Sequence, residues 1–275
     1  MMGFSSRNLK YMRSFAETWT DEQIVQQLAA QIPWFHNCIL LDKVKPKPER
    51  IWYIQETITN GWSRAVLKHQ IETKLYQRQG KTITNFDLTL PQSQSDLAQQ
   101  LIKDPYTFDF LTLAQKAQER DLEKALLERI RSFLLELGTG FAFVDSQYHL
   151  EVCGDDFYID LLFYHMKLRC YIVIDLKTTN FKPEYSGKMS FYVSVVDDLL
   201  RHPDDKPTIG IILCKSRNQI VAEYALRDVN KPIAVSQYKH ELPASLQNVL
   251  PSIEQLEAEL TMVEMIETES SDLSD

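Results

Sequence analysis

The apolar and polar residues of this chain follow a helical period in its N-terminal part and a strand period in much of the rest. Ser5 and Ser6 are residues that can accept hydrogen bonds from the free amides at a helix start, so they predict a first helix that runs to Glu17. A capping box at Thr20 predicts a second helix that ends at about Gln31. The N-terminal part is therefore expected to be mainly helical.

The segment 49–80 predicts two further helices across a tight turn. Pro46 and Pro48 indicate a loop before it, Asn60–Gly61 supplies the turn, and Gly80 ends the second helix. Two helices across a short turn are typical of the helix-turn-helix modules that bind DNA. DNA binding by the N-terminal part is therefore one hypothesis.

The second helix of this pair carries four basic residues, namely Arg64, Lys68, Lys74 and Arg78. On a helical projection they share a sector with the apolar residues Leu67, Ile71 and Leu75. This sector is typical of a packing surface, with long basic side chains that reach past its flanks into water. The sequence alone leaves contact between this helix and a phosphate backbone open.

A less regular connector over 89–113 separates the helices from a strand-rich block. The block opens with a strong helix over 117–138, which Gly138 ends. Its apolar face comprises Leu122, Leu126, Ile130, Phe133, Leu134 and Leu137. Strand patterns then cover 140–152 (one strand or two), 155–165, 168–179, 207–216 and 231–238, with helix patterns over 188–202 and 218–228. The order αβββαβαβ predicts an antiparallel meander extended by helical crossovers, which makes a mixed sheet.

The strands over 155–165 and 168–179 are separated by a tight connection and are expected to pair as a hairpin. Phe157, Ile159, Leu161 and Phe163 form one wholly apolar face of the first strand, and Cys170, Ile172, Ile174 and Leu176 form one of the second. Burying these two faces together fixes the register, since a slip by one residue would expose one of them. That register predicts that Asp160, Asp175 and Lys177 share the other face, with the two aspartates as near-diagonal neighbours.

Two carboxylates that converge at a sheet edge repel each other unless a cation or a proton lies between them. A hard divalent ion with oxygen ligands suits such a pair, and Mg²⁺, with Mn²⁺ as a substitute, is the expected ion. The ammonium group of Lys177 could orient or help to deprotonate an attacking water, or stabilise charge that develops on a phosphate. The sequence therefore predicts a hydrolytic site for phosphodiesters.

The pattern "YID" at 158–160 followed by "DLK" at 175–177 resembles the D…(D/E)xK signature of the PD-(D/E)XK nuclease superfamily. Longer stretches, "FLLELGTGFAFV", "DDFYIDLLFYH", "LKTTNFKPEYSGKMSFY" and "DKPTIGIILCKS", resemble the YhcG-type nucleases of bacteria. "GFSSRNLKYMRSFAE", "GWSRAVL" and "KDPYTFDFL" resemble the helical N-terminal domain of that family, so an upstream segment is expected to be missing. The resemblance implies a restriction-endonuclease-like α/β core, αβββαβ, behind a mainly α-helical N-terminal domain.

The resemblance also implies roles for individual residues. Asp160 and Asp175 would be metal ligands, and Lys177 would be the catalytic lysine. The acidic residue on the preceding helix would be Glu123, with Glu119 as a rival one turn earlier. Supporting positions on the helix after the motif would be Lys188 and Tyr192, which lie four residues apart. The alternative for every one of these residues is an ordinary structural role, in a surface ion pair or in helix packing.

Charge and cysteine content change this picture little. The net charge is −8, but eight acidic residues and no Lys or Arg lie between Glu254 and Asp275. The rest of the chain carries 30 charges of each sign, so it permits nucleic-acid binding without favouring it. Cys38, Cys153, Cys170 and Cys214 form no CxxC pair and are expected to be reduced thiols. The sequence shows neither an apolar run long enough for a membrane span nor a signal peptide, so we expect no membrane partner and a cytoplasmic location.

The sequence thus predicts a helical, DNA-binding-like domain over 1–112, a nuclease domain over 113–250 and an acidic tail over 251–275. The predicted function is Mg²⁺-dependent hydrolysis of nucleic acid, with DNA as the expected substrate, by an endonuclease. One alternative is an inactive nuclease fold that binds nucleic acid, and another is a partner-binding module in a defence or toxin–antitoxin assembly. Homodimer formation and the number of metal ions stay open.

Overall fold

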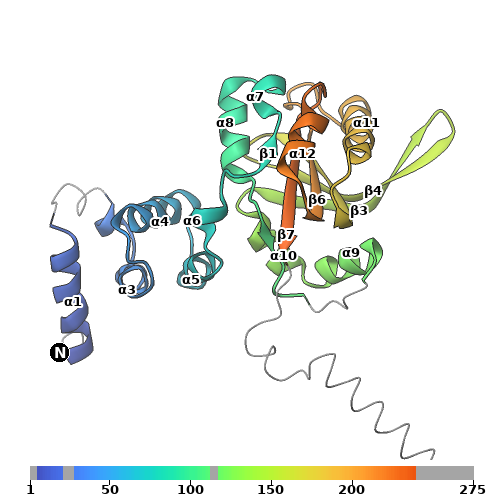
Figure 1. The fold of residues 1–275 in the computed structure, drawn as a ribbon. Helices are drawn as coiled ribbons and strands as arrows, with labels where there is room; N and C mark the ends of the chain where they lie inside the picture. The colour runs from blue at the N-terminus through green and yellow to red at the C-terminus, as the bar shows by residue number, and fades with distance from the viewer. Residues whose placement is uncertain (1–4, 21–27, 112–116, 240–275) are drawn as a thin grey trace, which may run out of the picture.

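The computed structural model describes residues 5–20, 28–111 and 117–239 of the chain. A group of helices from the N-terminal part lies beside an α/β part built on one sheet (Figure 1). The helix predicted over 20–31 falls largely on residues outside the described ranges, as does the acidic tail. In the part of the chain that the structure describes, every helix is too short or too polar to cross a bilayer.

The helical part consists of α1 (Ser6–Thr18), the 3-10 turn η1 (Ala29–Gln31), α3 (Trp34–Lys43), α4 (Lys47–Asn60), α5 (Arg64–Glu72) and α6 (Leu75–Arg78). The predicted first helix is confirmed, because Ser5 caps α1 by accepting a hydrogen bond from the backbone N–H of Asn8. Helix α3 was not predicted. Its buried residues combine apolar and polar types, so its sequence gives little amphipathic signal.

Two predictions in this region are wrong in detail. Pro48 does not lie in a loop but in the first turn of α4, where a residue without an N–H costs no helical hydrogen bond. The single helix predicted up to Gly80 is broken at Lys74, whose backbone adopts the left-handed conformation at φ 54°. The carbonyl of Thr73 accepts a hydrogen bond from Nε of Arg78 at 2.7 Å, so a side chain satisfies the backbone at the break. The turn at Gly61 is confirmed, with φ 62° at the end of α4.

The α/β part contains the strands β1 (Ile83–Thr84), β2 (Tyr106–Thr107), β3 (Phe141–Val152), β4 (Asp155–His165), β5 (Cys170–Asn180), β6 (Ile209–Ser216) and β7 (Ile233–Lys239). Its helices are α7 (Phe86–Thr89), α8 (Gln92–Leu101), α9 (Glu119–Glu128), α10 (Ile130–Leu137), α11 (Glu184–Leu199) and α12 (Gln219–Leu226). Strands β3, β4 and β5 form the predicted antiparallel meander, and β6 and β7 extend it in parallel. The predicted mixed sheet is confirmed.

The residues just before the expected domain boundary at 112 belong to this sheet. Strand β1 pairs with β7 in the antiparallel sense, and β2 pairs with the same strand in the parallel sense. The buried side chain of Asn85 joins these elements, since it accepts from the N–H of Ile233 and donates to the carbonyls of Val229 and Lys231. The boundary stays a prediction, and these contacts favour a position nearer to Gly80.

Helices cover both faces of the sheet. Helices α9 and α10 pack on one face, where Leu122, Leu126, Phe133 and Leu137 are buried as predicted. Helices α11 and α12 pack on the other face with Met189, Val193, Ala222 and Leu226. The long helix predicted over 117–138 is nevertheless wrong, because the chain leaves helical geometry at Arg129. Both segments still direct their apolar side into the same core.

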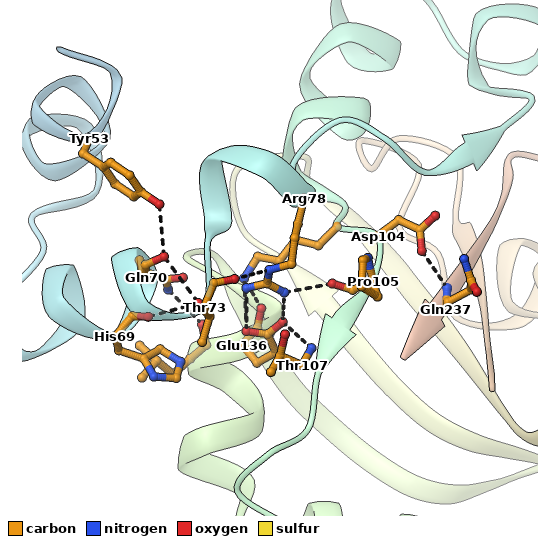
Figure 2. A network of polar contacts seen from close by, with 12 residues as sticks. Tyr53, His69, Gln70, Thr73, Arg78, Asp104, Pro105, Thr107, Glu136 and Gln237 are labelled. Carbon is orange, nitrogen blue, oxygen red and sulfur yellow. Dashed lines mark hydrogen bonds and ion pairs between the residues drawn. The ribbon is translucent and has the colours of Figure 1, made fainter. Parts of the chain in front are cut away.

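A buried ion pair joins the helical part to the α/β part. Figure 2 shows the guanidinium of Arg78 against the carboxylate of Glu136, with an Nη1–Oε1 distance of 2.5 Å. Arg78 also donates to the carbonyl of Pro105 at 2.9 Å, and Glu136 accepts from the backbone N–H of Thr107 at 2.8 Å. Lys103 donates to the carbonyl of Glu136, and burial lowers the pKa of this lysine to about 8. The packing surface predicted for this helix thus includes Arg78 itself, whose side chain is buried and does not reach into water as expected.

Breaking this ion pair is expected to destabilise the whole chain. Arg78→Met would leave the fully buried carboxylate of Glu136 without its main partner, at a cost of about 3 to 5 kcal/mol in the free energy of unfolding. Arg13→Met is the matched control, because Arg13 forms a solvent-exposed pair with Glu17 whose loss should leave the free energy of unfolding almost unchanged. Urea unfolding followed by circular dichroism measures both, and equal losses would show that the junction does not depend on the pair.

Candidate active site

The site lies on three neighbouring strands, at positions that are opposite one another across the sheet. Ser146 pairs with Leu161, and Leu161 pairs with Ile174, so one further step along the ladders brings Gln147, Asp160 and Asp175 into one row across β3, β4 and β5. The two aspartates therefore occupy opposite positions and not the predicted diagonal ones. The paired residues of β4 and β5 end at Leu161, and Oδ2 of Asp160 instead accepts a hydrogen bond from the N–H of Leu176 at 2.8 Å.

The predicted faces of the first hairpin strand need a correction. Leu161 and Phe163 pack toward α9 and α10, whereas Phe157 and Ile159 pack with the cluster under α11 and α12. The alternation of side chains along β4 thus reverses at Asp160. The reversal lies opposite Gln147 of β3, whose left-handed backbone interrupts that strand between Ser146 and Tyr148.

Asp175 is the most deeply buried acidic group of the site, with 2% of its side chain exposed. Lys188 donates to its Oδ1 at 3.0 Å, and Nζ of Lys177 lies 2.9 Å from its Oδ2. The ammonium of Lys177 directs its hydrogen bonds to the carbonyl of Leu176 at 2.9 Å and to Glu119 at 3.2 Å. Oδ2 of Asp175 is consequently a buried acceptor with a charge nearby but no aligned donor.

Lys177 is held as a cation. Burial by itself lowers its pKa, but the adjacent carboxylate of Asp175 outweighs this effect, and the pKa lies above the usual value for lysine. Its Nζ also lies 5.3 Å from the centre of the Tyr185 ring, which favours the charged form. Lys177 is thus suited to stabilising negative charge, and of the two roles considered from the sequence the structure favours this one over that of a base.

Asp160 is the second aspartate of the site, and its surroundings disfavour its charged form. Burial, followed by the charge of Asp175, raises the pKa of Asp160 to about 6. Glu123 of α9 is also buried, which raises its pKa, and its Oε2 accepts a hydrogen bond from Nε2 of Gln147 at 2.6 Å. The same Nε2 atom lies 3.5 Å from Oδ1 of Asp160. The rival acidic residue, Glu119, instead contacts Lys177.

The structure therefore brings Asp160, Asp175 and Lys177 together, with Glu123 connected to them through Gln147. Lys188 and Tyr192 also reach the site, since Nζ of Lys188 lies 5.1 Å from the centre of the Tyr192 ring, and the Tyr192 hydroxyl donates to the carbonyl of Tyr158. Sequence reasoning missed Gln147. No motif or spacing marks this residue, because its importance arises from a backbone conformation that only the fold reveals.

The donor set fits one divalent ion with water ligands. Within the described ranges, no group of three or more His, Cys, Asp or Glu side chains is arranged to hold a metal ion by itself. Mg²⁺ usually takes one or two protein carboxylates and keeps several waters. Asp160 and Asp175 supply such a pair, and the buried Oδ2 of Asp175 lacks an aligned donor. The four cysteines are free thiols, as predicted.

Two family comparisons cover most of the chain. Residues 99–253 match the YhcG PDDEXK nuclease domain, and residues 1–78 match the DUF1016 N-terminal domain. The chain is 32% identical to the Escherichia coli (strain K12) protein named "Putative nuclease YhcG", over 88% of this chain and 72% of that protein.

Solved structures give more distant matches. A repair endonuclease from Pyrococcus abyssi aligns with 48% of this chain and 50% of its own, at 13% identity and a TM-score of 0.31. EndoMS, in a structure titled as a complex with double-stranded DNA, aligns with 48% of this chain and 47% of its own, at 14% identity and a TM-score of 0.33. Each of these alignments spans about half of the solved chain.

Neutralising Asp160 is expected to stabilise the metal-free protein. The pKa of this carboxyl group is higher in the folded chain than in the unfolded chain, so its protonated form stabilises the fold at low pH. That contribution to the free energy of unfolding is lost as the pH rises from about 4 through 6. With EDTA at pH 7.5, Asp160→Asn should raise the free energy of unfolding by about 1 to 2 kcal/mol, and the gain should vanish below about pH 4. Urea unfolding at several pH values measures this, and a gain that persists at pH 3.5 would contradict the argument.

Proposed function

We propose that this chain, which belongs to the family of YhcG-type PDDEXK nucleases, hydrolyses phosphodiester bonds in DNA at Asp160, Asp175 and Lys177. The convergence of these three side chains where the pairing of β4 and β5 ends is the observation that carries the proposal. PDDEXK nucleases generally use divalent metal ions, and Mg²⁺ is the ion that we assign to the two aspartates.

The residues divide the chemistry between them. Asp160 and Asp175 would hold the ion, which when bound supplies an activated water and charge neutralisation at the phosphate. Lys177, kept charged by Asp175, stabilises the negative charge that develops on the phosphate oxygens. Lys188 donates to Oδ1 of Asp175 and so shares the neutralisation of this carboxylate with Lys177. Glu123 supplies a further carboxylate, and the side-chain amide of Gln147 lies between it and Asp160.

The helical part supports nucleic acid as the substrate. Arg7, Lys43, Arg64 and Lys68 line a hollow of about 780 Å³ together with aromatic residues that include the exposed Phe35. Basic side chains with an interleaved aromatic ring suit a phosphate backbone and its bases. Helices α4 and α5 also meet across the turn at Gly61, in the order of a helix-turn-helix unit. We therefore propose DNA, with RNA as the alternative that the assay separates.

The purified chain is expected to cleave DNA when Mg²⁺ or Mn²⁺ is present and to lose this activity in EDTA. Asp175→Ala and Lys177→Ala should each reduce the rate by about 10²-fold or more, because each removes a group that acts on charge in the transition state. Lys182→Ala is the matched control, since Lys182 is an exposed lysine close in sequence that should leave the rate unchanged. The assay uses plasmid, linear, branched and RNA substrates.

Each other outcome has a distinct meaning. Cleavage that survives in both active-site variants would place the activity elsewhere or in a contaminant. Binding of DNA without cleavage in any metal, unaffected by Asp160→Ala, would identify the chain as an inactive nuclease fold that binds nucleic acid. Preferential cleavage of RNA would retain the site and replace the substrate. A co-purifying protein partner without affinity for nucleic acid would favour a partner-binding module.

A further inference from the structure

Gln147 places a neutral amide between two acidic side chains of the site. Its Nε2 lies 2.6 Å from Oε2 of Glu123 and 3.5 Å from Oδ1 of Asp160. An amide nitrogen carries two hydrogens, so one group can face both carboxylates at once. From this geometry we infer that Gln147 limits the site to one divalent ion, by filling the place between Glu123 and Asp160 where a second would bind. The inference rests on the proposed metal site at Asp160 and Asp175.

The backbone explains how the amide reaches this place. Gln147 has φ 48°, in the left-handed region that residues other than glycine rarely adopt. Ser146 and Tyr148 on either side both pair with β4, at Leu161 and Ile159, so the irregularity is confined to the residue that faces Asp160. A strained backbone that is held in place by regular pairing on both sides is a feature that functional sites share.

Electrostatics explains what the amide replaces. Glu123 is 7% exposed, and the hydrogen bond from Gln147 opposes the effect of burial on its pKa. Asp160 has its other oxygen on the N–H of Leu176. Without the amide, two partly buried carboxylates would face each other across the space that Nε2 now fills. A second divalent ion with oxygen ligands would then be the favoured occupant, as in sites with two metal ions.

Counting bound ions tests the inference directly. Isothermal titration calorimetry of the full chain with Mn²⁺ should give one ion per chain for the natural sequence and two for Gln147→Gly. Glycine removes the amide and is also the residue that φ 48° suits best, so this variant should fold. Adding Glu123→Gln to Gln147→Gly should return the count to one, because the second ion depends on Glu123. Gln147→Ala also removes the amide and should likewise bind two ions.

The control has the same backbone change away from the site. Cys153 is exposed at the end of β3 with φ 55°, so Cys153→Gly should leave the count at one. Two ions in the natural chain, or one in both Gln147 variants with native circular dichroism, would overturn the inference and leave the proposed nuclease site intact. No Mn²⁺ binding in the natural chain, with no change on Asp175→Ala, would instead overturn the proposed metal site itself.

Discussion

Burying the carboxylate of Asp175 in the middle of β5, just past its last paired residue with β4, is the constraint around which the candidate active site is organised. A buried charge is tolerated only with partners, and Lys177 from the same strand and Lys188 from α11 supply them. Asp160 adds a second acidic group, whose raised pKa reflects burial and the presence of Asp175. Two strands and a helix therefore converge on the same few atoms, and the two lysines each neutralise part of the charge of Asp175.

The basic residues of the helical part divide into two groups with different physical roles. Arg64 and Lys68 are exposed on α5, whereas Arg78 turns inward and binds Glu136. The inward turn depends on the break at Lys74, which lets Arg78 satisfy the carbonyl of Thr73 and reach α10. A single row in the sequence thus contributes both to the outer surface and to the contact between the two parts of the chain (Figure 2).

The sequence was sufficient for the meander and the mixed sheet, because strand alternation and the burial of apolar faces are strong local signals. The meeting of Asp160, Asp175 and Lys177 was also predicted, although the alternation assumed along β4 holds only as far as Asp160. The sequence was not sufficient for the breaks at Lys74 and Arg129, where the apolar period continues across a change of backbone direction. Nor could it predict the reversal at Asp160 or the position of Gln147. Those features depend on how β3 and β4 fit together, and no single residue type encodes that fit.

The placement of Glu136 on α10 has a consequence for how such proteins can be recombined. Helices α9 and α10 follow each other through Arg129, so the stretch that anchors Arg78 also carries Glu119 and Glu123 to the candidate active site. A chimera that exchanges the N-terminal helices between relatives would have to transplant Arg78 and Glu136 as a matched couple. Otherwise the buried carboxylate of Glu136 would be left without its partner, one short helix away from the candidate active site.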